Sequence, residues 1–389
     1  MTEEANVTGE AGVVGGAGAA GRDAVSATSG ASATGGPAAP DADVTVRPGE
    51  QDAGAGGRDA GGERFADVGR GITLCYERIG DPQAPPMVLV AGLGQQLLSW
   101  PLPFCEELAG RGFCVIRFDN RDTGRSTHIG TRPPSLPAMI TRRVGSRQYH
   151  LGDMARDAIG LLDALGYPDA HFAGISMGGM IAQTAAAHFP ARVRSLASLL
   201  STTDAPRVGR PALKTWLMMA SGRPPRTRDE DMAAAVRIFR YIGSHGYPFD
   251  EAFVRQLAGD GWDRDPTSDG WRRQLAAILA SGDRTAELRR ITAPTVVIHG
   301  DRDRMVHPSG GAATAAAIPG ARLETIRGLG HDLPEGAWTT IIDLIAANAR
   351  RAGERSAGAP VSGGAAAVRQ DNGQAGPDTT RSTHAQTGT

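Results

Sequence analysis

The stretch 170–189, AHFAGISMGGMIAQTAAAHF, decides the fold of this 389-residue chain. Its first part, AHFAGI, is the mostly apolar run of a buried strand, and MGGMIAQTAAAHF has the composition of a helix. Between the two, residues 174–178 read G-I-S-M-G and match the pattern G-x-S-x-G. Such a serine occupies a sharp turn from strand to helix, where neighbouring glycines leave room for a strained backbone. The stretch therefore predicts that Ser176 is a nucleophile at the end of a strand.

Segments typical of strands and of helices alternate on both sides of this turn. Most of the strand segments are continuous apolar runs, as in parallel strands that are buried on both faces. Strands are predicted at 71–79, 87–91, 113–120, 170–176, 193–200, 293–300 and 321–328, and helices at 99–110, 153–166 and 177–189. Because strands that alternate with helices form a mostly parallel sheet covered on both faces, we expect an α/β fold with a doubly wound sheet.

Residues 201–290 interrupt this alternation. They are typical of several consecutive helices, near 211–220, 229–243, 249–258 and 268–281, separated by prolines and glycines. We expect this region to form a helical cap, inserted over one end of the sheet within a single α/β domain at 65–351.

The two ends of the chain differ in composition from the rest. Phe65 is the first aromatic residue, and no Leu or Ile precedes it. A segment this poor in large apolar side chains cannot bury enough surface to offset the entropy lost on ordering. We expect residues 1–64 to be a disordered arm and residues 352–389, which have a similar composition, to be a disordered tail.

Charge and hydropathy exclude several classes of partner. The formal net charge is −1, and no block of Lys and Arg provides a binding surface for nucleic acid. No apolar run approaches the roughly 18 residues of a membrane-spanning helix, and the N-terminal MTEEANVTGE lacks the apolar region of a secretory signal. We expect a cytoplasmic protein that binds neither nucleic acid nor a membrane; no motif indicates its oligomeric state.

The three cysteines do not predict a disulfide framework or a metal site. Cys75, Cys105 and Cys114 are odd in number and match no zinc or C-x-x-C spacing. Each lies in a predicted strand or helix, so we expect all three to be buried as small apolar residues.

A serine hydroxyl is a weak nucleophile, and its activation requires a base held by an acid. After a G-x-S-x-G turn the acid comes next in the chain and the histidine last. His331, on the glycine-rich loop GLGHD after the last predicted strand, satisfies this order. Asp301 and Asp303 follow the strand TVVIHG and are both candidates for the acid, and Asp204, after the strand VRSLASLL, is a third.

The negative charge that forms on an attacked carbonyl oxygen needs backbone N–H donors. The N–H of Met177 lies at the start of the predicted helix, where the helix dipole adds to the stabilisation. The loop AGLG at 91–94 follows the strand at 87–91, and its glycines allow the backbone to approach a substrate oxygen. We predict that the N–H groups of Leu93 and Met177 form the oxyanion hole.

The order of these motifs resembles that of the α/β-hydrolase superfamily across about 65–351. The resemblance is carried by MVLVAGLG, RFDNRDTGRST, GDMARDAIGLLDALG, GISMGGMIAQ, TVVIHGDRDRMV and GLGHDLP. Within the superfamily, DNRDTGRST, the G-x-S-M-G turn and the segment GYPFD at 246–250 resemble the aclacinomycin methylesterase-like bacterial esterases. Through the spacing HG-x-x-D-x-x-V, the resemblance favours Asp303 as the acid and makes Asp301 a turn residue. It also implies that Asp122 and Ser126 fix a loop near the active site.

The resemblance implies a serine hydrolase that cleaves a small-molecule carboxylic ester through an acyl-enzyme. Ser176 would be the nucleophile, His331 the base and Asp303 the acid, and the chemistry would need no cofactor and no metal. Other activities of the same fold remain as alternatives: a cofactor-free haloperoxidase with the same triad, a peptidase in which the acidic residues 229–231 bind an amine, and a binding protein without catalysis.

Overall fold

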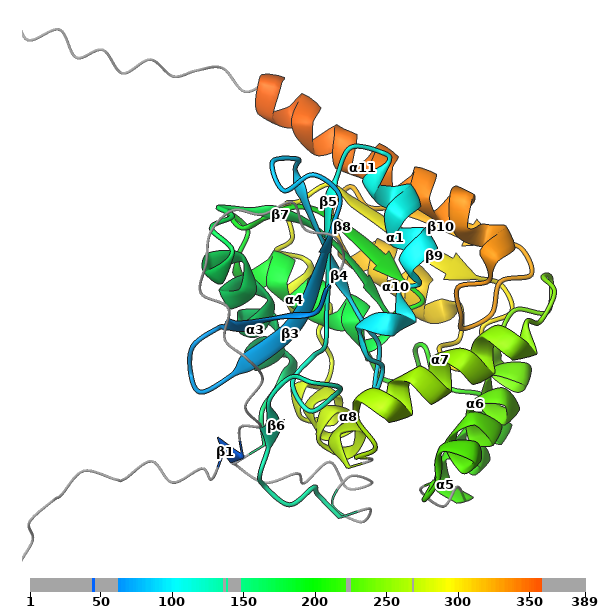
Figure 1. The fold of residues 1–389 in the computed structure, drawn as a ribbon. Coiled ribbons are helices and arrows are strands. Elements are labelled where there is room, and N and C mark those ends of the chain that lie inside the picture. The colour runs from blue at the N-terminus through cyan, green and yellow to red at the C-terminus, as the bar shows by residue number, and fades with distance from the viewer. Residues whose placement is uncertain are drawn as a thin grey trace, which may run out of the picture. The chain divides into compact units, whose positions relative to one another are not determined.

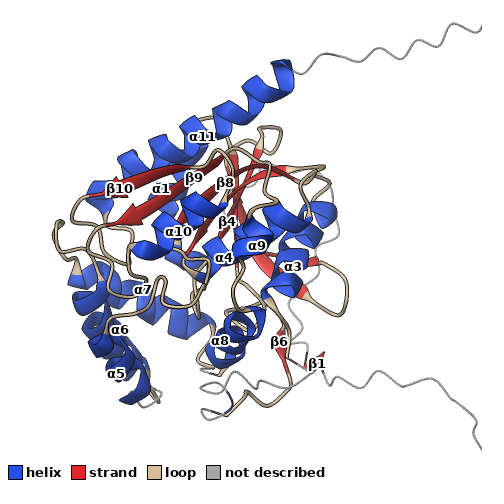
Figure 2. Ribbon diagram, turned by 180° about the vertical axis from the view of Figure 1, so that it is seen from behind, coloured by secondary structure: helices blue, strands red, loops and turns tan. Residues whose placement is uncertain are grey.

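The computed structural model describes residues 44–45, 62–135, 138, 148–221, 225–267 and 269–358. All described residues belong to one unit, Ala42–Thr389. In that unit an eight-stranded sheet has helices on both faces (Figures 1 and 2).

The central sheet has the strand order β10-β9-β8-β7-β4-β5-β3-β2. Neighbouring strands from β10 to β5 are parallel, whereas β3 and β2 pair antiparallel at the other edge. The strands are β2 (Arg64–Asp67), β3 (Thr73–Ile79), β4 (Pro86–Val90), β5 (Cys114–Phe118), β7 (Ala170–Ile175), β8 (Val193–Leu199), β9 (Thr295–Gly300) and β10 (Arg322–Ile326). The predicted α/β fold with a mostly parallel sheet is therefore confirmed.

Two apolar layers cover the faces of the sheet. Side chains of a strand alternate between its faces, so in β4 Leu89 joins the core cluster of Phe104, while the adjacent Val88 joins the cluster of Phe172. Helices α1 (Leu102–Ala109) and α11 (Trp338–Gly358) contribute to the first cluster, and α3 (Leu151–Ala164) and α4 (Met177–His188) contribute to the second. The remaining short helices are η1 (Leu97–Ser99), α9 (Thr285–Leu288), α10 (Ser309–Ala317) and η2 (Glu335–Ala337).

Between β8 and β9 the described chain forms the short helix α9 and, before it, four helices that Figure 1 shows together at one end of the sheet. They are α5 (Leu213–Ser221), α6 (Arg228–Ile242), α7 (Glu251–Arg264) and α8 (Gly270–Ser281), here called the cap helices. Helix α7 extends past residue 258, where the sequence predicts its end. Its Gly259 provides space for an incoming side chain, because a Cβ there would lie 2.4 Å from Nη2 of Arg228 on α6. Packing between the two helices thus overrides the weak helix propensity of glycine.

The two termini of the predicted domain were placed at residues 65 and 351. Apart from residues 44–45, the described structure begins at residue 62, and helix α11 continues to Gly358. Within the arm predicted to be disordered, β1 (Val44–Thr45) pairs antiparallel with β6 (His128–Ile129). Most of the arm 1–64 and most of the tail 352–389 lie outside the described residues, so their predicted disorder stays a prediction.

The three cysteines are buried and free, as predicted. Burial raises the pKa of the Cys105 thiol to about 12, and it also raises the pKa of the Cys114 thiol. Because the thiolate is the reactive form, these residues act as apolar packing groups.

Candidate active site

Ser176 occupies the sharp turn that joins β7 to α4. Its backbone has φ 57° and ψ −119°, which a side chain other than that of glycine rarely adopts. Three hydrogen bonds hold this conformation: Ser176 N–H donates to Leu199 O at 2.9 Å, and Ser176 O accepts from Met180 N–H at 3.2 Å and from Ser201 Oγ at 2.8 Å. The strain, about 1–3 kcal/mol for such a residue, is therefore offset by contacts to β8 and to the loop after it.

The glycines around Ser176 are required by close backbone contacts. A Cβ on Gly174 would lie 2.2 Å from Gly178 O, and a Cβ on Gly178 would lie 2.1 Å from Val90 O. A Cβ on Gly179 would lie 2.7 Å from Cβ of Ser201. Since real Cβ atoms do not approach other atoms this closely, side chains here would push α4 away from the sheet.

The structure brings Ser176, His331 and Asp303 together from three segments of the chain. The Nε2 atom of His331 lies 3.0 Å from Ser176 Oγ, and its Nδ1 atom lies 2.7 Å from Asp303 Oδ2. Because a carboxylate only accepts, Nδ1 carries the proton, and Nε2 is then free to accept the proton of the serine hydroxyl. This is the arrangement that an activated serine requires: an imidazole in the reactive tautomer beside the hydroxyl, and a carboxylate that orients the imidazole.

Asp303 is buried, and two backbone N–H groups donate to its carboxylate. Its Oδ1 atom accepts from the N–H groups of Met305 and Val306, both at 2.8 Å. The imidazole of His299 lies 3.5 Å from Oδ2, and burial lowers its pKa. His299 is therefore neutral and donates from Nε2 to Val306 O at 2.9 Å. The negative charge of Asp303 is left to interact with His331.

The two other candidate acids occupy different places. Asp301 is exposed, and its Oδ1 atom accepts from Gly328 N–H at 2.6 Å, which fits the turn role expected for it. Asp204 lies in the loop after β8 with φ 57°, and its negative charge acts on Arg284. Neither of these contacts involves His331.

The loop that carries His331 is held by the end of cap helix α6. His331 N–H donates to Ile242 O at 2.9 Å, and Gly330 N–H donates to Ser244 Oγ at 2.8 Å. The Ser244 hydroxyl donates in turn to Oδ1 of Asp332, a carboxyl group whose pKa is raised by burial. The sequence analysis did not single out Ser244, because an isolated serine after a helix has no pattern that distinguishes it.

The predicted oxyanion donors lie on either side of Ser176. Met177 is the first residue of α4, and its side chain is buried. Leu93 is in a turn closed by the bond from Gln95 N–H to Gly92 O, at 3.1 Å. A Cβ on Gly92 would lie 3.5 Å from Cβ of Ser176, so the turn runs beside the nucleophile. The assignment of Leu93 and Met177 as donors remains a prediction.

The segment after β5 has the structural role that the resemblance implies. Ser126 Oγ donates to Asp119 O at 2.6 Å and accepts from Cys75 N–H at 2.9 Å. Asp122 accepts from Ile129 N–H, from the Tyr149 hydroxyl and from Arg273 of α8. Asp122 therefore joins the loop to the cap.

A second Ser–His pair occurs in the sheet itself. His171 Nδ1 lies 2.8 Å from Ser195 Oγ, and the two residues face each other across β7 and β8. His171 also packs edge-on against Phe113, and burial, followed by the charge of Arg194, lowers the pKa of His171 to about 4. The pair is buried in regular strands, without the exposed turn that a nucleophile needs, so its role is structural.

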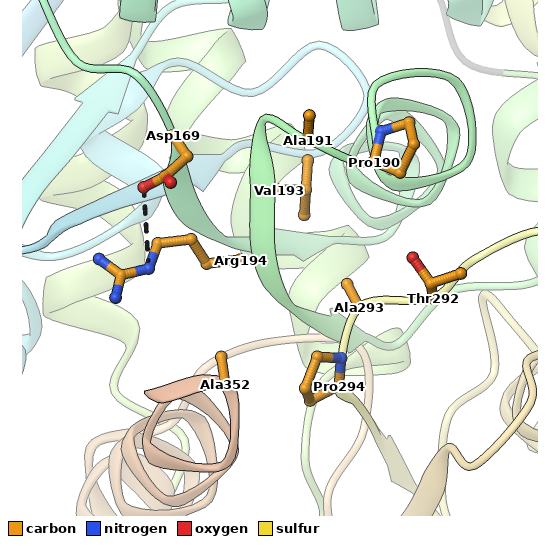
Figure 3. Close-up of a pocket in the computed structure, with 9 residues that line it drawn as sticks. All are labelled: Asp169, Pro190, Ala191, Val193, Arg194, Thr292, Ala293, Pro294 and Ala352. Carbon is orange, nitrogen blue, oxygen red and sulfur yellow. Dashed lines mark ion pairs between the residues drawn. The ribbon is translucent and has the colours of Figure 1, made fainter. Parts of the chain in front are cut away.

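Other features of the described residues lie outside this site. Figure 3 shows a pocket lined by Val193 at the start of β8 and Pro294 before β9, with Arg194 3.7 Å from Asp169. In parallel strands these are the amino ends, opposite the end at which Ser176 lies. In the described ranges, no group of His, Cys, Asp and Glu side chains is arranged to bind a metal, and no helix is long and apolar enough to cross a membrane.

Curated relatives match most of the chain. It is 30% identical over 315 residues to rhodomycin D methylesterase DauP of Streptomyces sp. strain C5, which covers 72% of this chain and 96% of the relative. It is also 30% identical over 301 residues to rhodomycin D methylesterase DnrP of Streptomyces peucetius, with the same coverage of 72% and 96%.

Solved structures share the fold. An enol-lactonase from Burkholderia xenovorans LB400 superposes with a TM-score of 0.57 at 24% identity, over 73% of this chain and 98% of that chain. A hydrolase from Pseudomonas aeruginosa PA01 superposes with a TM-score of 0.55 at 26% identity, over 76% and 99%. Residues 85–336 match the family described as "alpha/beta hydrolase fold". Since that match spans more than half of a chain with the expected sheet and serine turn, this protein belongs to the α/β-hydrolase fold family.

Proposed function

We propose that this α/β hydrolase cleaves carboxylic esters, with Ser176 as the nucleophile, His331 as the general base and Asp303 as the acid that orients it. The observation that carries the proposal is the continuous chain of hydrogen bonds, 3.0 Å from Ser176 Oγ to His331 Nε2 and 2.7 Å from His331 Nδ1 to Asp303. The strained turn under Ser176 keeps its hydroxyl at the end of this chain.

The reaction follows from this geometry. As Ser176 Oγ attacks the ester carbonyl, its proton passes to His331 Nε2, and the imidazolium is stabilised by Asp303. The tetrahedral oxyanion is held by the N–H groups of Leu93 and Met177. His331 then gives the proton to the leaving alcohol, and water, activated by the same imidazole, releases the acid from Ser176. No step requires a metal or an organic cofactor.

We further propose that the physiological substrate is the methyl ester of a carboxylic acid. The two relatives at 30% identity are both named as rhodomycin D methylesterases. The peptidase alternative receives less support, because the acidic residues 229–231 lie in the first turn of α6, whereas its last residue, Ile242, contacts the His331 loop. At 1.5 Å per residue the helix separates them by about 16 Å.

The experiment measures ester hydrolysis by the full chain and by variants. We expect turnover of p-nitrophenyl butyrate and release of methanol from an aromatic methyl ester such as methyl 1-naphthoate. Ser176→Ala and His331→Ala should each lower kcat by about 10³-fold or more. Ser195→Ala is the matched control, because it removes the serine of the buried Ser–His pair and should leave kcat unchanged.

Labelling with a fluorophosphonate separates the alternatives. The proposal requires that the wild type is labelled and that Ser176→Ala is not. A folded wild type that is neither labelled nor active on either ester would refute ester hydrolysis and favour a binding protein. Labelling at Ser176 without ester turnover would instead direct attention to peroxide-dependent halide oxidation.

A further inference from the structure

Helix α8 is fixed to the core by buried contacts near its first turn. Its Arg273 forms a buried ion pair with Asp122, with Nη2 2.8 Å from Oδ1, and also donates from Nη1 to Thr131 O at 3.2 Å. A Cβ on Gly270, the first residue of α8, would lie 1.7 Å from Asp122 O, so the helix start touches the backbone after β5. The first turn of α8 is therefore held against the core.

From helix α8 the side chain of Gln274 forms a hydrogen bond with the turn at 92–95. Gln274 is completely buried, and both ends of its amide are bonded: Oε1 accepts from Gly94 N–H at 2.8 Å, and Nε2 donates to Arg121 O at 2.8 Å. The orientation of the amide is determined, because one end faces a donor and the other faces an acceptor. Arg121 is itself anchored, with Nη2 2.7 Å from Asp157 Oδ1.

The turn that Gln274 holds has a conformation that requires support. Gly94 has φ 67°, and a Cβ there would lie 3.1 Å from Cβ of Trp271, one helical turn before Gln274. Gln95 N–H donates to Gly92 O and closes the turn, and Gly94 N–H donates to the side chain of Gln274. A shift of Gly94 would move the backbone of Leu93 relative to Ser176.

We propose that Gln274 is a positioning residue for the oxyanion hole. It fixes the turn at 92–95 so that the Leu93 N–H points at the developing oxyanion on the substrate bound to Ser176. The inference rests on the proposed function, and it gives α8 a part in catalysis besides covering the site. Gln274 touches neither substrate nor Ser176; it acts through Gly94.

The expected effect is on the transition state more than on substrate binding. Complete loss of one oxyanion donor lowers kcat by about 10²–10³-fold in other enzymes. Gln274→Met keeps the volume but can neither accept from Gly94 nor donate to Arg121, so the donor is loosened and not removed. We expect kcat to fall by about 10–100-fold with KM changed less than about threefold.

The experiment compares three variants of the full chain on p-nitrophenyl butyrate. Gln274→Glu keeps the acceptor toward Gly94, and complete burial favours its protonated form, whose hydroxyl can donate to Arg121 O. It should therefore recover most of the kcat that Gln274→Met loses. Gln183→Met is the matched control: Gln183 is also fully buried and also bonded at both amide ends, to Ser198 and Arg284, but lies away from the turn. It should lower stability while leaving kcat of the folded protein near that of the wild type.

A boronic acid matched to the acyl group provides the readout that a merely structural role would not move. It forms a tetrahedral adduct on the serine that resembles the transition state. Its inhibition constant should therefore increase in Gln274→Met by the factor by which kcat/KM decreases, while the inhibition constant of butyrate stays the same. If Gln274→Met does not fold, Gln274→Asn, which is too short to reach both groups, carries the same expectation.

The outcomes separate this inference from the proposed function. An active wild type with a folded Gln274→Met variant of unchanged kcat and boronate affinity would overturn the role of Gln274 alone. Equal losses in the Met and Glu variants, or an equal loss in Gln183→Met, would likewise reduce Gln274 to a stabilising residue. An inactive, unlabelled wild type would remove the proposed function and this inference with it.

Discussion

Asp303→Asn tests the assignment of the triad acid with almost no change in shape. The Oδ1 atom of Asp303 accepts from Met305 and Val306 N–H groups, and an asparagine keeps these bonds by placing its oxygen there. Its NH₂ group then faces Nδ1 of His331, where Oδ2 now lies at 2.7 Å. Two donors cannot face each other, so Nδ1 must become the acceptor and Nε2 must carry the proton. In that tautomer His331 cannot accept the proton of Ser176.

The magnitude has an electrostatic part and a tautomeric part. Charge centres about 4 Å apart, as in a carboxylate hydrogen-bonded to an imidazolium, attract by about 4 kcal/mol at an effective dielectric constant of about 20. Losing that attraction in the transition state lowers kcat by about 10³-fold. The unreactive tautomer adds to this loss, so we expect a decrease between about 10³- and 10⁴-fold, comparable to the same substitution in serine proteases.

The assay is steady-state hydrolysis of p-nitrophenyl butyrate at pH 7.5, with thermal unfolding to verify the fold. Asp301→Asn is the matched control, because Asp301 is exposed and makes no contact with His331. Its Oδ1 atom accepts from Gly328 N–H, and an asparagine preserves that bond. We expect Asp301→Asn to stay within about threefold of the wild type. A folded Asp303→Asn variant that keeps a tenth of the activity would refute the reasoning, and a large loss in Asp301→Asn or Asp204→Asn would move the acid to that residue.

Three further predictions concern residues around the site. Ser244→Ala removes the hydrogen bonds that join the Gly330 N–H to the Asp332 carboxyl, so we expect the free energy of unfolding to fall by about 1–3 kcal/mol in urea titrations and kcat to fall about tenfold. Ser244→Thr should restore both values, and unchanged kinetics in Ser244→Ala would contradict the role of Ser244 in holding the His331 loop. Burial lowers the pKa of His171 from 6.5 to about 4, so between these pH values the imidazole is protonated in the unfolded chain and neutral in the folded one. The free energy of unfolding should therefore drop by about 2 kcal/mol from pH 7 to pH 5, and an equal drop in His171→Gln would exclude His171 as its cause. Gly178→Ala should prevent folding because its Cβ would overlap a backbone oxygen, whereas a Cβ at Gly152 meets nothing within 4 Å, so Gly152→Ala should show wild-type or slightly higher stability in a thermal melt. A stable Gly178→Ala protein would show that the turn can relax.

The sequence predicted the sheet and the candidate triad because both follow from short-range patterns. Continuous apolar runs identify buried strands, and chain order after G-x-S-x-G singles out His331. Choosing Asp303 over Asp301 needed the spacing of a known family, since both aspartates follow the same strand. Their different environments, one buried beside His299 and one exposed, depend on how the loop folds back.

Residues that act through tertiary contacts left no signal of this kind. Gln274 and Ser244 are single polar residues in or after amphipathic helices, and nothing in their neighbours indicates that their partners are Gly94 and Gly330, far away in the chain. The length of α7 was underestimated for a related reason, because Gly259 fits the contact with α6 although glycine weakens a helix. Local propensity cannot include such contacts.

Two of the attachments between cap and core lie beside the proposed site and restrict how this enzyme can diversify. Its inner segments, 242–246 at the end of α6 and 270–274 at the start of α8, hold the His331 loop and the turn before Gln95. Between them, α7 has an exposed outer face that includes Phe253. A chimaera that exchanges residues 247–258 with a relative keeps the buried ion pair of Arg264 with Asp119. It should therefore inherit new selectivity with the host's turnover intact. A chimaera that exchanges the whole insertion would also replace the residues that contact Gly94 and Gly330, and it should lose kcat until further substitutions restore those contacts.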